Sequence, residues 1–422
     1  MQIGFDFGTT NSSIACLTNE GDVKLAKFAH SGGSTSSYRS LLYLELLAHA
    51  SRKTIKSWSG PAAIDRYLNA DERGRLIQSL KSFLSNRGLQ STEVFGRRIT
   101  LEDLVANILR DIRTEASAYF GFPIKEAVVG RPIRFVGAES EAEDTYAVSR
   151  LETAMYRAGF ERITFEYEPV AAAYHYESTL DRNELILIGD FGGGTSDFSL
   201  LRVGPEIRKR GREPRDLLGN EGLGLAGDAF DAKIVRHLVS PALGAGSLLH
   251  SFGKKLPVPN WVYFKLERWH HLSFLRSSET LNMLRTVRAQ AEERAKLNAL
   301  LYLVENDLGY QLHRSVQRAK VTLSHADRTV FRFTDGDLEL EEEVRRDQFE
   351  EWIGEELALI ERSVDNLLAK TGAAAHDVDM VFLTGGSSLV PAVRRIFERR
   401  FGTAKIRTGD EFTSVARGLA LK

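Results

Sequence analysis

Two short stretches of the chain combine carboxylates, glycines and hydroxyl side chains in a pattern that could bind a phosphate group. In the stretch 185–201, which reads LILIGDFGGGTSDFSLL, a buried strand would end at Asp190, turn through three glycines at 192–194 and leave as a second strand. Glycines adopt backbone conformations that other residues avoid, so several N–H groups can converge on an anion. Carboxylates at a strand end suit a hydrated magnesium ion. An ordinary hairpin turn has similar glycines, so the choice depends on whether the pattern recurs.

The pattern recurs at a constant offset of 184 residues. Residues 5–17 read FDFGTTNSSIACL and residues 189–201 read GDFGGGTSDFSLL, so that Asp6 aligns with Asp190. Internal repeats set the architecture of a chain. The two copies therefore predict two similar lobes, each supplying one hairpin turn to a shared cleft that holds the phosphates of a nucleotide and their metal ion.

The stretches between these turns read as strands and helices that would place the turns in α/β lobes. The clearest amphipathic helix covers 100–119, with Thr100 as its N-cap. A further helix opens at Glu168, before a proline, and a strand at 379–384 runs into two glycines. The stretch 240–316 is locally basic and aromatic. A helical subdomain with its own small core explains this stretch better than a partner surface does, although both interpretations stay open.

Two further helices are expected from the residue pattern. A charged helix is predicted over 71–86, and a long helix over 279–323 with Gly309 as the place where it could break. Residues 329–334 and 338–343 read as a hairpin around an Asp-Gly turn.

Length and composition limit the classes of protein that need to be considered. A chain of 422 residues can form two lobes with substantial cores, and 43% hydrophobic and 27% charged residues are usual for a folded protein. The net charge of −1 gives no indication of a nucleic-acid or membrane partner. The single cysteine, Cys16, fits a reducing compartment. The sequence has no signal peptide and no apolar run of ~18 residues, so we expect a cytoplasmic protein.

The chemical motifs follow one another in a fixed order along the chain. Besides the two Asp-Gly turns, the set contains Lys81 in LKSFLSNRG, Glu168 in YEPVAAAYHY and Gly385-Gly386 in LTGGSSLVPAVRRIF. This order resembles the actin-like ATPase superfamily, and within it the ATPase domain of the heat-shock protein 70 family, the DnaK-like chaperones. GLAGDAFDAKIV, QRAKVTLS and FTSVARGLAL are similar to further motifs of that family. The long insert resembles most the short DnaK-like proteins of the YegD type.

The resemblance implies an α/β fold with two actin-like lobes. Each would be a ribonuclease-H-like lobe, with a mixed five-stranded sheet flanked by helices, and a nucleotide cleft would lie between them. Lobe I would cover 1–182, with a helical or mixed subdomain at about 30–100. Lobe II would cover 183–405, with a helical insert subdomain at about 228–345, and a C-terminal helix within 406–422 would return to lobe I.

The resemblance also implies ATP or ADP and Mg²⁺ as cofactors, and assigns roles to residues. Asp6 and Asp190 would hold the metal through its waters, because Mg²⁺ gives up water reluctantly. Lys81 would offset the charge of the γ-phosphate and place the attacking water. Glu168 and Asp197 would orient that water or accept its proton. The catalytic set is thus Lys81, Glu168, Asp190, Thr195 and Asp197. The nucleotide contacts would come from Gly8, Thr9, Thr10, Asn11, Gly192, Gly193, Gly194, Thr195, Gly227, Lys320, Ser324, Gly385, Gly386 and Ser387.

The chain also departs from the family pattern on the adenine side. Val321 and Leu389 stand where the family has two arginines that sandwich the adenine ring. A cation–π contact contributes roughly 0.5–2 kcal/mol, so their loss is expected to weaken nucleotide binding. The Gly-Gly-acidic turn has become Ala226-Gly227-Asp228. Because the sequence stops at Lys422, we expect no peptide-binding domain of the usual kind.

The function expected from the resemblance is Mg²⁺-dependent hydrolysis of ATP to ADP and phosphate, which would drive lobe rotation in a monomeric DnaK-like protein. A protein partner or client could bind the helical insert of lobe II. One alternative is a module that binds nucleotide without hydrolysing it. Another is a filament-forming relative of actin that is involved in cell shape. A sugar kinase of the same superfamily is a weaker alternative, because the sequence contains no recognisable sugar-site motif. A P-loop is excluded, since no GxxxxGK[ST] sequence occurs.

Overall fold

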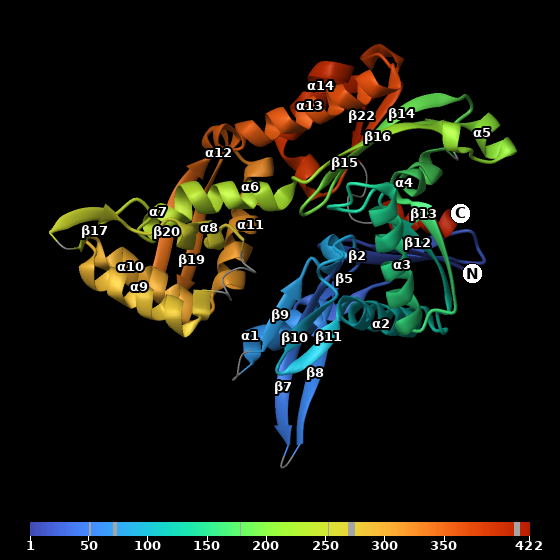
Figure 1. Ribbon diagram of the computed structural model, residues 1–422. Helices are drawn as coiled ribbons and strands as arrows, with labels where there is room; N and C mark the ends of the chain where they lie inside the picture. Colours follow the sequence, from blue (N-terminus) through green and yellow to red (C-terminus); the bar gives the residue numbers. More distant parts are fainter. Residues whose placement is uncertain (50–51, 71–73, 178, 252, 269–274, 409–413) are drawn as a thin grey trace. The chain divides into compact units, whose positions relative to one another are not determined.

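The computed structural model describes residues 1–422 apart from 50–51, 71–73, 178, 252, 269–274 and 409–413 (Figure 1). The chain forms two compact units, which are described separately below. Unit 1 comprises Met1–Gly224, Arg362–Ser388 and Phe397–Lys422, and unit 2 comprises Leu225–Glu361 and Leu389–Ile396. Among the described residues, no helix combines the length and the apolar character that crossing a bilayer requires.

The first mixed sheet of unit 1 has the order β13-β12-β1-β2-β3, and β6 pairs beside β2. Its strands are β1 (Gln2–Phe7), β2 (Asn11–Leu17), β3 (Val23–Leu25), β6 (Tyr38–Arg39), β12 (Glu126–Arg131) and β13 (Arg162–Tyr167). β1 runs antiparallel to β2 and parallel to β12. Apolar side chains such as Phe5, Phe7 and Ile14 are completely buried, which explains why these segments form the centre of the sheet.

The second mixed sheet of unit 1 repeats this topology. Its strands are β14 (Glu184–Phe191), β15 (Ser196–Val203), β16 (Leu217–Leu223), β21 (Met380–Thr384) and β22 (Ile406–Thr408). In the order β16-β15-β14-β21-β22, an antiparallel hairpin is again extended on one side by two parallel strands. The repeat at an offset of 184 residues therefore corresponds to a repeated sheet, as predicted. The fold is the two-lobed α/β fold expected from the sequence.

Helices pack against these sheets, and two of them, α2 and α4, begin where the sequence predicts a helix. They are α2 (Leu101–Phe120), α3 (Glu141–Arg157), α4 (Glu168–Glu177), α5 (Pro205–Arg210), α13 (Gly354–Thr371), α14 (Pro391–Phe401) and α15 (Ser414–Leu421). The hydroxyl of Thr100 accepts a hydrogen bond from the Asp103 N–H at 3.2 Å, so the predicted N-cap of α2 is confirmed. On the second sheet, the Phe397 ring of α14 lies against Phe191 and Phe198.

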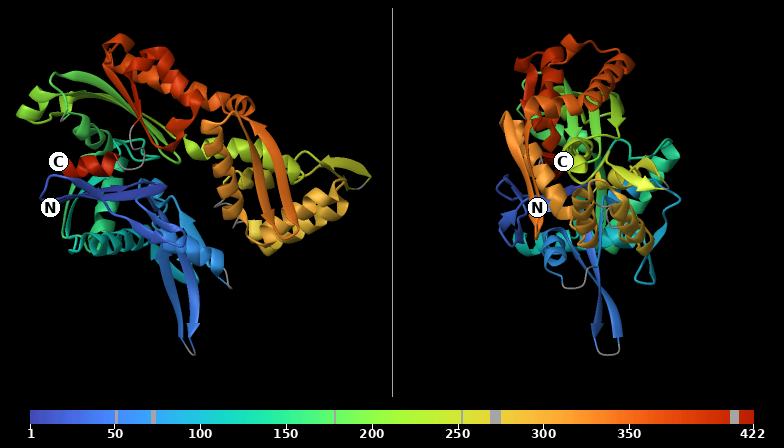
Figure 2. Two further views of the ribbon diagram at one scale, coloured as in Figure 1. Left: turned by 180° about the vertical axis from the view of Figure 1, so that it is seen from behind. Right: turned by 90° about the vertical axis from the view of Figure 1, so that its left-hand side faces the viewer.

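The C-terminal helix α15 packs closely on both β1 and α4. A methyl group at Gly418 would overlap the carbonyl oxygen of Ala171 in α4, and one at Gly4 in β1 would overlap the carbonyl oxygen of Ala416. Only glycine allows the backbones to approach so closely. The two ends of the chain consequently lie near each other in unit 1 (Figures 1 and 2). The segment 406–422 thus supplies strand β22 before it supplies the helix.

The rest of unit 1 is a group of smaller elements, of which the β7–β8 ribbon projects visibly (Figure 2). They are β4 (Phe28–His30), β5 (Gly33–Thr35), β7 (Leu41–His49), β8 (Arg52–Ser59), α1 (Gly60–Asn69), β9 (Arg75–Gln78), β10 (Ser91–Val94) and β11 (Arg97–Thr100), with a 3₁₀ turn at Leu80–Phe83. The helix predicted over 71–86 is wrong in its described part. Strand β9 pairs with β7 there, and tertiary pairing overrides the helical propensity of the charged residues.

Unit 2 is mainly helical and contains two short hairpins. Its elements are α6 (Gly227–Ile234), a π-helix at Val235–Val239, α7 (Ser240–Ala242), β17 (Leu248–Ser251), β18 (Lys254–Pro257), α8 (Trp261–Leu266), α9 (Ser278–Gln290), α10 (Arg294–Glu305), α11 (Gly309–His325), β19 (Arg328–Asp335), β20 (Leu338–Arg345) and α12 (Arg346–Trp352), followed by the start of α13. The long helix predicted over 279–323 is three helices. One break precedes Gly309 as predicted, where Asp307 has a positive φ of 52°, and the other follows Gln290.

Candidate functional site

The two glycine turns meet within unit 1. The first turn joins β1 to β2 at Gly8–Thr10, and the second joins β14 to β15 at 192–195. A methyl group at Gly193 would overlap the hydroxyl oxygen of Thr10, so glycine at this position lets the second turn lie close against the first. The Gly192 N–H donates to the Thr195 carbonyl at 2.8 Å and closes the second turn. The structure therefore brings the two predicted phosphate-binding turns together.

Three aspartates surround these turns. Asp6 lies near the end of β1 and Asp190 near the end of β14, and Asp197 in β15 is the register partner of Asp190. The hydroxyl of Thr384, the last residue of β21, donates to Asp190 Oδ1 at 2.7 Å. This bond follows from the parallel pairing of Asp190 with Thr384. The sequence analysis missed Thr384, although its position directly before Gly385-Gly386 was a signal.

Each of these carboxyl groups has a raised pKa in the protein. Burial, followed by the nearby charge of Glu168, raises the pKa of Asp6 well above its ordinary value. Burial also raises the pKa of Asp190, although its hydrogen bond from Thr384 acts in the opposite direction. The pKa of Asp197 rises to about 7, because burial and the charges of Asp190 and Glu168 disfavour the ionised form.

A buried ion pair completes the group. Lys81 Nζ lies 2.8 Å from Glu168 Oε1, and the two side chains are only 8% and 15% exposed. Lys81 comes from the 3₁₀ turn that follows Ser79, whose backbone is left-handed with φ of 58°, and Glu168 is the first residue of α4. Burial alone would lower the pKa of Lys81, but Glu168 and Asp6 outweigh it and raise the pKa. Lys81 therefore stays a cation beside the carboxylates.

The donor set fits a hydrated magnesium ion. The aspartates outnumber the nearby cation, and burial and mutual repulsion raise their pKa values, so a divalent cation would stabilise the ionised group. Among the residues that the structure describes, no group of three or more His, Cys, Asp or Glu side chains is arranged to hold a bare ion. Mg²⁺ commonly keeps several waters and contacts one or two carboxylates, as Asp6 and Asp190 could provide.

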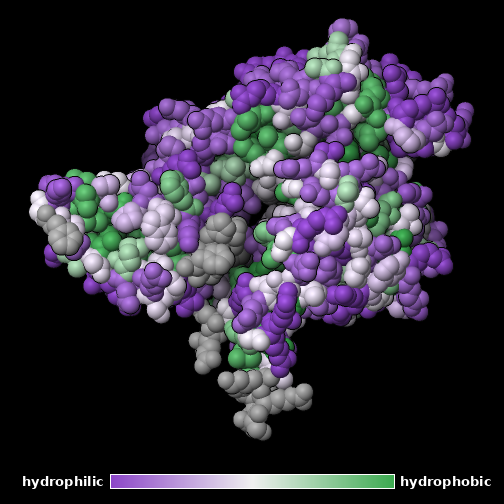
Figure 3. Space-filling view, viewed as in Figure 1, coloured by the Kyte–Doolittle hydropathy of each residue, from purple (hydrophilic) through white to green (hydrophobic). Residues whose placement is uncertain are grey.

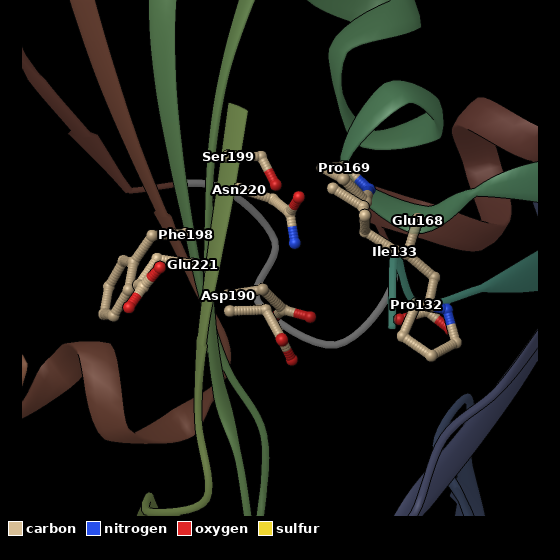
Figure 4. A pocket seen from close by; sticks show the side chains of 10 residues that line it. Pro132, Ile133, Glu168, Pro169, Asp190, Phe198, Ser199, Asn220 and Glu221 are labelled. Carbon is tan, nitrogen blue, oxygen red and sulfur yellow. The ribbon is translucent and has the colours of Figure 1, made fainter. Parts of the chain in front are cut away.

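A small pocket opens beside this group of side chains (Figure 4). Asp190 and Asn220 face the side of the pocket on which Glu168 and Pro132 lie, whereas the ring of Phe198 lies on the other side of its strand. Asn220 was not predicted, because nothing in the sequence around β16 indicates that this position of the strand lines a pocket.

Arg131 supports the wall of the pocket and was also missed by the sequence analysis. Its guanidinium donates to the Pro132 carbonyl at 3.1 Å, forms an ion pair with Asp144 and lies 5.1 Å from the centre of the Tyr167 ring. Tyr167 directly precedes Glu168. Arg131 thus contacts both the Pro132 backbone, which lines the pocket, and the ring of the residue before Glu168.

The glycines at the end of β21 also lie next to the second turn. Gly385 has a positive φ of 82°, and a methyl group there would overlap the carbonyl oxygen of Phe191. Gly386 and Ser387 begin a short 3₁₀ helix, in which Ser387 is buried. The backbone of this predicted adenosine motif therefore contacts the strand that carries Asp190.

The remaining predicted nucleotide contacts, Gly227, Lys320 and Ser324, belong to unit 2. Lys320 Nζ lies 2.8 Å from Asp231 Oδ1 and donates to the Gly227 carbonyl at 3.1 Å. The Ser324 hydroxyl donates to the Lys320 carbonyl at 3.2 Å. The side chains of Lys320 and Ser324 therefore bond to groups of unit 2 itself. Val321, on the same helix α11, is 55% exposed.

Comparison with known proteins identifies the family. The model of the Hsp70 protein family matches residues 70–243 and 292–422, which is well over half of the chain. The chaperone protein DnaK of Deinococcus deserti is 26% identical over 431 residues, which cover the whole chain and 59% of the relative. DnaK of Thermosipho africanus is 25% identical over 422 residues, with 58% of the relative covered. The chain spans less than three fifths of the length of these curated relatives. On the family match, and with the duplicated lobes already described, the chain belongs to the Hsp70 family.

Proposed function

We propose that the protein binds ATP with Mg²⁺ and hydrolyses it to ADP and phosphate. The observation that carries this proposal is the buried Lys81–Glu168 ion pair beside Asp6, Asp190 and Asp197, next to the two glycine turns. Phosphoryl transfer depends mainly on positioning and on charge stabilisation, and these residues offer a cation, several carboxylates and backbone N–H groups.

In the proposed reaction, a water attacks the γ-phosphorus, and the bond from that phosphorus to the β–γ bridging oxygen breaks to release ADP. Lys81 would neutralise charge on the γ-phosphate oxygens. Asp197, with a pKa of about 7, is suited to accept the proton of the attacking water near neutral pH. Asp6 and Asp190 would hold the hydrated Mg²⁺, which supplies charge neutralisation at the phosphates when it is bound. As the resemblance implies, turnover would drive a rotation of the lobes of a monomeric protein.

The test is release of phosphate from ATP by the purified chain, with and without Mg²⁺. We expect hydrolysis that requires Mg²⁺ and that is lost in Asp190→Ala. A matched control is Asp365→Asn, which changes a carboxylate in α13, outside the proposed catalytic set. Phosphate release at the same rate in the wild type and in Asp190→Ala would overturn the proposal.

A second candidate function is a module that binds nucleotide without turnover. The observation that favours it lies on the adenine side, where Val321 and Leu389 stand in place of the two arginines of the family pattern, so that their cation–π contacts with the adenine ring are lost. Calorimetry separates the two functions. ATP binding without phosphate release would support the sensor, and no affinity for ATP or ADP would exclude both.

A further inference from the structure

The stretch 244–291 of unit 2 lies between the two blocks that match the Hsp70 family model. It contains β17, β18, α8 and α9, and we call it the unmatched segment. The segment is tied firmly to the rest of unit 2. The Glu292 N–H donates to the Leu248 carbonyl at 2.9 Å, and the Tyr263 hydroxyl donates to the Leu243 carbonyl at 3.0 Å. Its described part is therefore an ordered addition to unit 2.

Helix α8 is the best-anchored part of the unmatched segment. Its inner face buries Val262, Tyr263 and Leu266. The carbonyl of Leu266 lies 2.8 Å from Nε2 of the buried His313, and both carboxylate oxygens of Glu267 accept hydrogen bonds of 2.8 Å from Arg236. Because these contacts fix both the inner face and the C-terminal end, a ligand would not have to order α8 on binding.

The outer face of the same helix carries two exposed aromatic side chains. Trp261 is 41% exposed and Phe264 is 60% exposed. They are three positions apart, so they lie on one side of the helix. Leu256 in the preceding strand β18 is 45% exposed. Elsewhere in this unit, Figure 3 shows further hydrophobic surface among hydrophilic residues, near the elements that Figure 1 labels β17 and α10. An exposed aromatic pair on a rigid helix, unlike a single exposed residue, is typical of a binding surface.

The charges along this stretch are mostly positive. Residues 254–268 contain four cations and one acid, namely Lys254, Lys255, Lys265, Arg268 and Glu267. The acid is paired with Arg236, Lys255 lies 2.6 Å from Glu292, and the Lys265 ammonium lies 5.1 Å from the centre of the Trp261 ring. Lys254 and Arg268 are exposed. Cations at the edge of an aromatic surface attract an acidic partner and repel a basic one.

We propose that the outer face of α8, formed by Trp261 and Phe264 with the exposed cations Lys254 and Arg268 around them, is a docking surface for an acidic protein segment that carries apolar side chains. The apolar side chains of that segment pack on the two aromatic rings, and its carboxylates pair with the cations. The surface is small, so the complex belongs to the weak, transient class. The proposal goes beyond the ATPase function and does not depend on it.

Aromatic and basic residues together also occur in surfaces that bind single-stranded nucleic acid. The charge of the chain favours a protein segment, because a net charge of −1 provides no extended positive field for a phosphate backbone.

The experiment measures fluorescence anisotropy of labelled probes with the full chain, in the absence of nucleotide. The main probe is a short peptide in which Asp and Glu alternate with Leu and Phe. Three controls are the same peptide with Lys at the acidic positions, an acidic peptide with Ser at the apolar positions, and an oligo-dT strand. We expect the acidic apolar peptide to bind at least tenfold more tightly than each control, with an affinity that falls as salt rises. Equal binding of the basic peptide, tighter binding of oligo-dT, or no binding of the main probe would overturn the proposal.

Variants locate the binding on the surface. We expect Phe264→Ala and Trp261→Ala each to weaken binding of the main peptide roughly tenfold or more. Lys254→Glu is expected to weaken binding less and to reduce its salt dependence. Tyr156→Ala is the matched control, because Tyr156 is a 49% exposed aromatic residue on α3 of unit 1. Circular dichroism and melting curves check that each variant is folded. Unchanged affinity in a folded Phe264→Ala variant would contradict the proposal.

Discussion

The two mixed sheets of unit 1 share one topology, yet Asp6 and Asp190 have different neighbours in them. In the second sheet, Thr384 of the neighbouring strand donates a hydrogen bond to Asp190. In the first sheet, the pairing of Phe5 with Val129 places Gly130 beside Asp6 at the corresponding position. A Cβ atom at Gly130 would lie 3.1 Å from Cγ of Glu168. Glycine at position 130 therefore offers Asp6 no side-chain hydrogen-bond donor, but it leaves room for the side chain of Glu168.

A second difference concerns the partner strand of each hairpin. Asp6 lies opposite Ser13, whereas Asp190 lies opposite a second carboxylate, Asp197. The duplication thus preserved the backbone, and the chemistry of the halves diverged through single positions. If the proposed function is correct, the second sheet supplies the proton acceptor, while the elements around the first sheet supply the Lys81–Glu168 pair.

Lys81→Met removes the Lys81–Glu168 ion pair that the elements around the first sheet supply, and it is expected to have the largest effect. Removal of this cation leaves Glu168 and Asp6 buried without their neutralising partner, so we expect ATP hydrolysis to fall by roughly 10³-fold. A buried charge without a partner also lowers the free energy of unfolding, by about 3–5 kcal/mol. Single-turnover phosphate release and urea unfolding measure the two effects. Wild-type hydrolysis in this variant would show that the first half is not needed for turnover.

Asp197→Asn tests the extra carboxylate of the second sheet. We expect hydrolysis to fall by roughly 10²-fold or more, as for loss of a general base. Stability should change in the opposite direction. Because the pKa of Asp197 is about 7, above the ordinary value of 3.8, the folded protein loses stability as pH rises from about 4 to 7, and Asn removes this loss. Without nucleotide and Mg²⁺, the melting temperature of the variant at pH 7.5 should rise by roughly 1 °C for each kcal/mol recovered, because the chain has 422 residues. No gain is expected at pH 4.

Melting curves of Asp197→Asn at the two pH values decide this point. Ser13→Asn, at the corresponding position of the first sheet, is the control and should not acquire this pH dependence. A variant that melts below the wild type at pH 7.5 would contradict the assignment of a raised pKa to Asp197.

Gly193→Ala tests whether nucleotide binding requires the contact between the two glycine turns. The added methyl group overlaps the Thr10 hydroxyl and would push the turns apart, so we expect ATP affinity to fall roughly tenfold. Thr10→Gly in the same chain should restore part of the loss, which a double-mutant cycle by calorimetry can measure. Additive effects of the two substitutions would mean that the contact between the turns does not matter for binding.

Thr384→Val is the mildest test, because it removes one hydrogen bond and keeps the shape of the side chain. Loss of the donor raises the pKa of Asp190 further. The bond contributes about 0.5–1.5 kcal/mol, so we expect a several-fold rise in the Mg²⁺ concentration needed for half-maximal hydrolysis. Thr371→Val, in a helix of the same unit, is a control for loss of a hydroxyl. An unchanged Mg²⁺ requirement would show that the hydrogen bond does not tune Asp190.

The sequence predicted the parts of the fold that depend on local patterns and on internal repetition. The repeat around Asp6 and Asp190 anticipated the two sheets, and Thr100 marked the start of α2. Lys81 and Glu168 were selected as site residues by motif order, and the structure brings them within 2.8 Å of each other. Their catalytic roles remain predictions, as does the assignment to the YegD type.

What the sequence did not reveal depends on pairing between distant parts of the chain. Thr384 reaches Asp190 across 194 positions, and the need for glycine at position 130 arises from a side chain of another element. The helix wrongly predicted over 71–86 failed for a related reason, since β9 forms only because β7 is there to pair with it. The exposure of Phe264 likewise follows from which face of α8 the rest of unit 2 covers. Local residue patterns do not contain this information.

The close packing of α15 has a practical consequence for following the site. This helix touches β1 at Gly4, two residues before Asp6, and α4 at Ala171, three residues after Glu168. A displacement of either carboxylate would therefore be transmitted to helix α15. Since the single native cysteine, Cys16, is buried, a cysteine introduced at position 422 would be an accessible thiol for a fluorescent label. Such a label would report on events at the nucleotide site from the far end of the helix, without any change to the site itself.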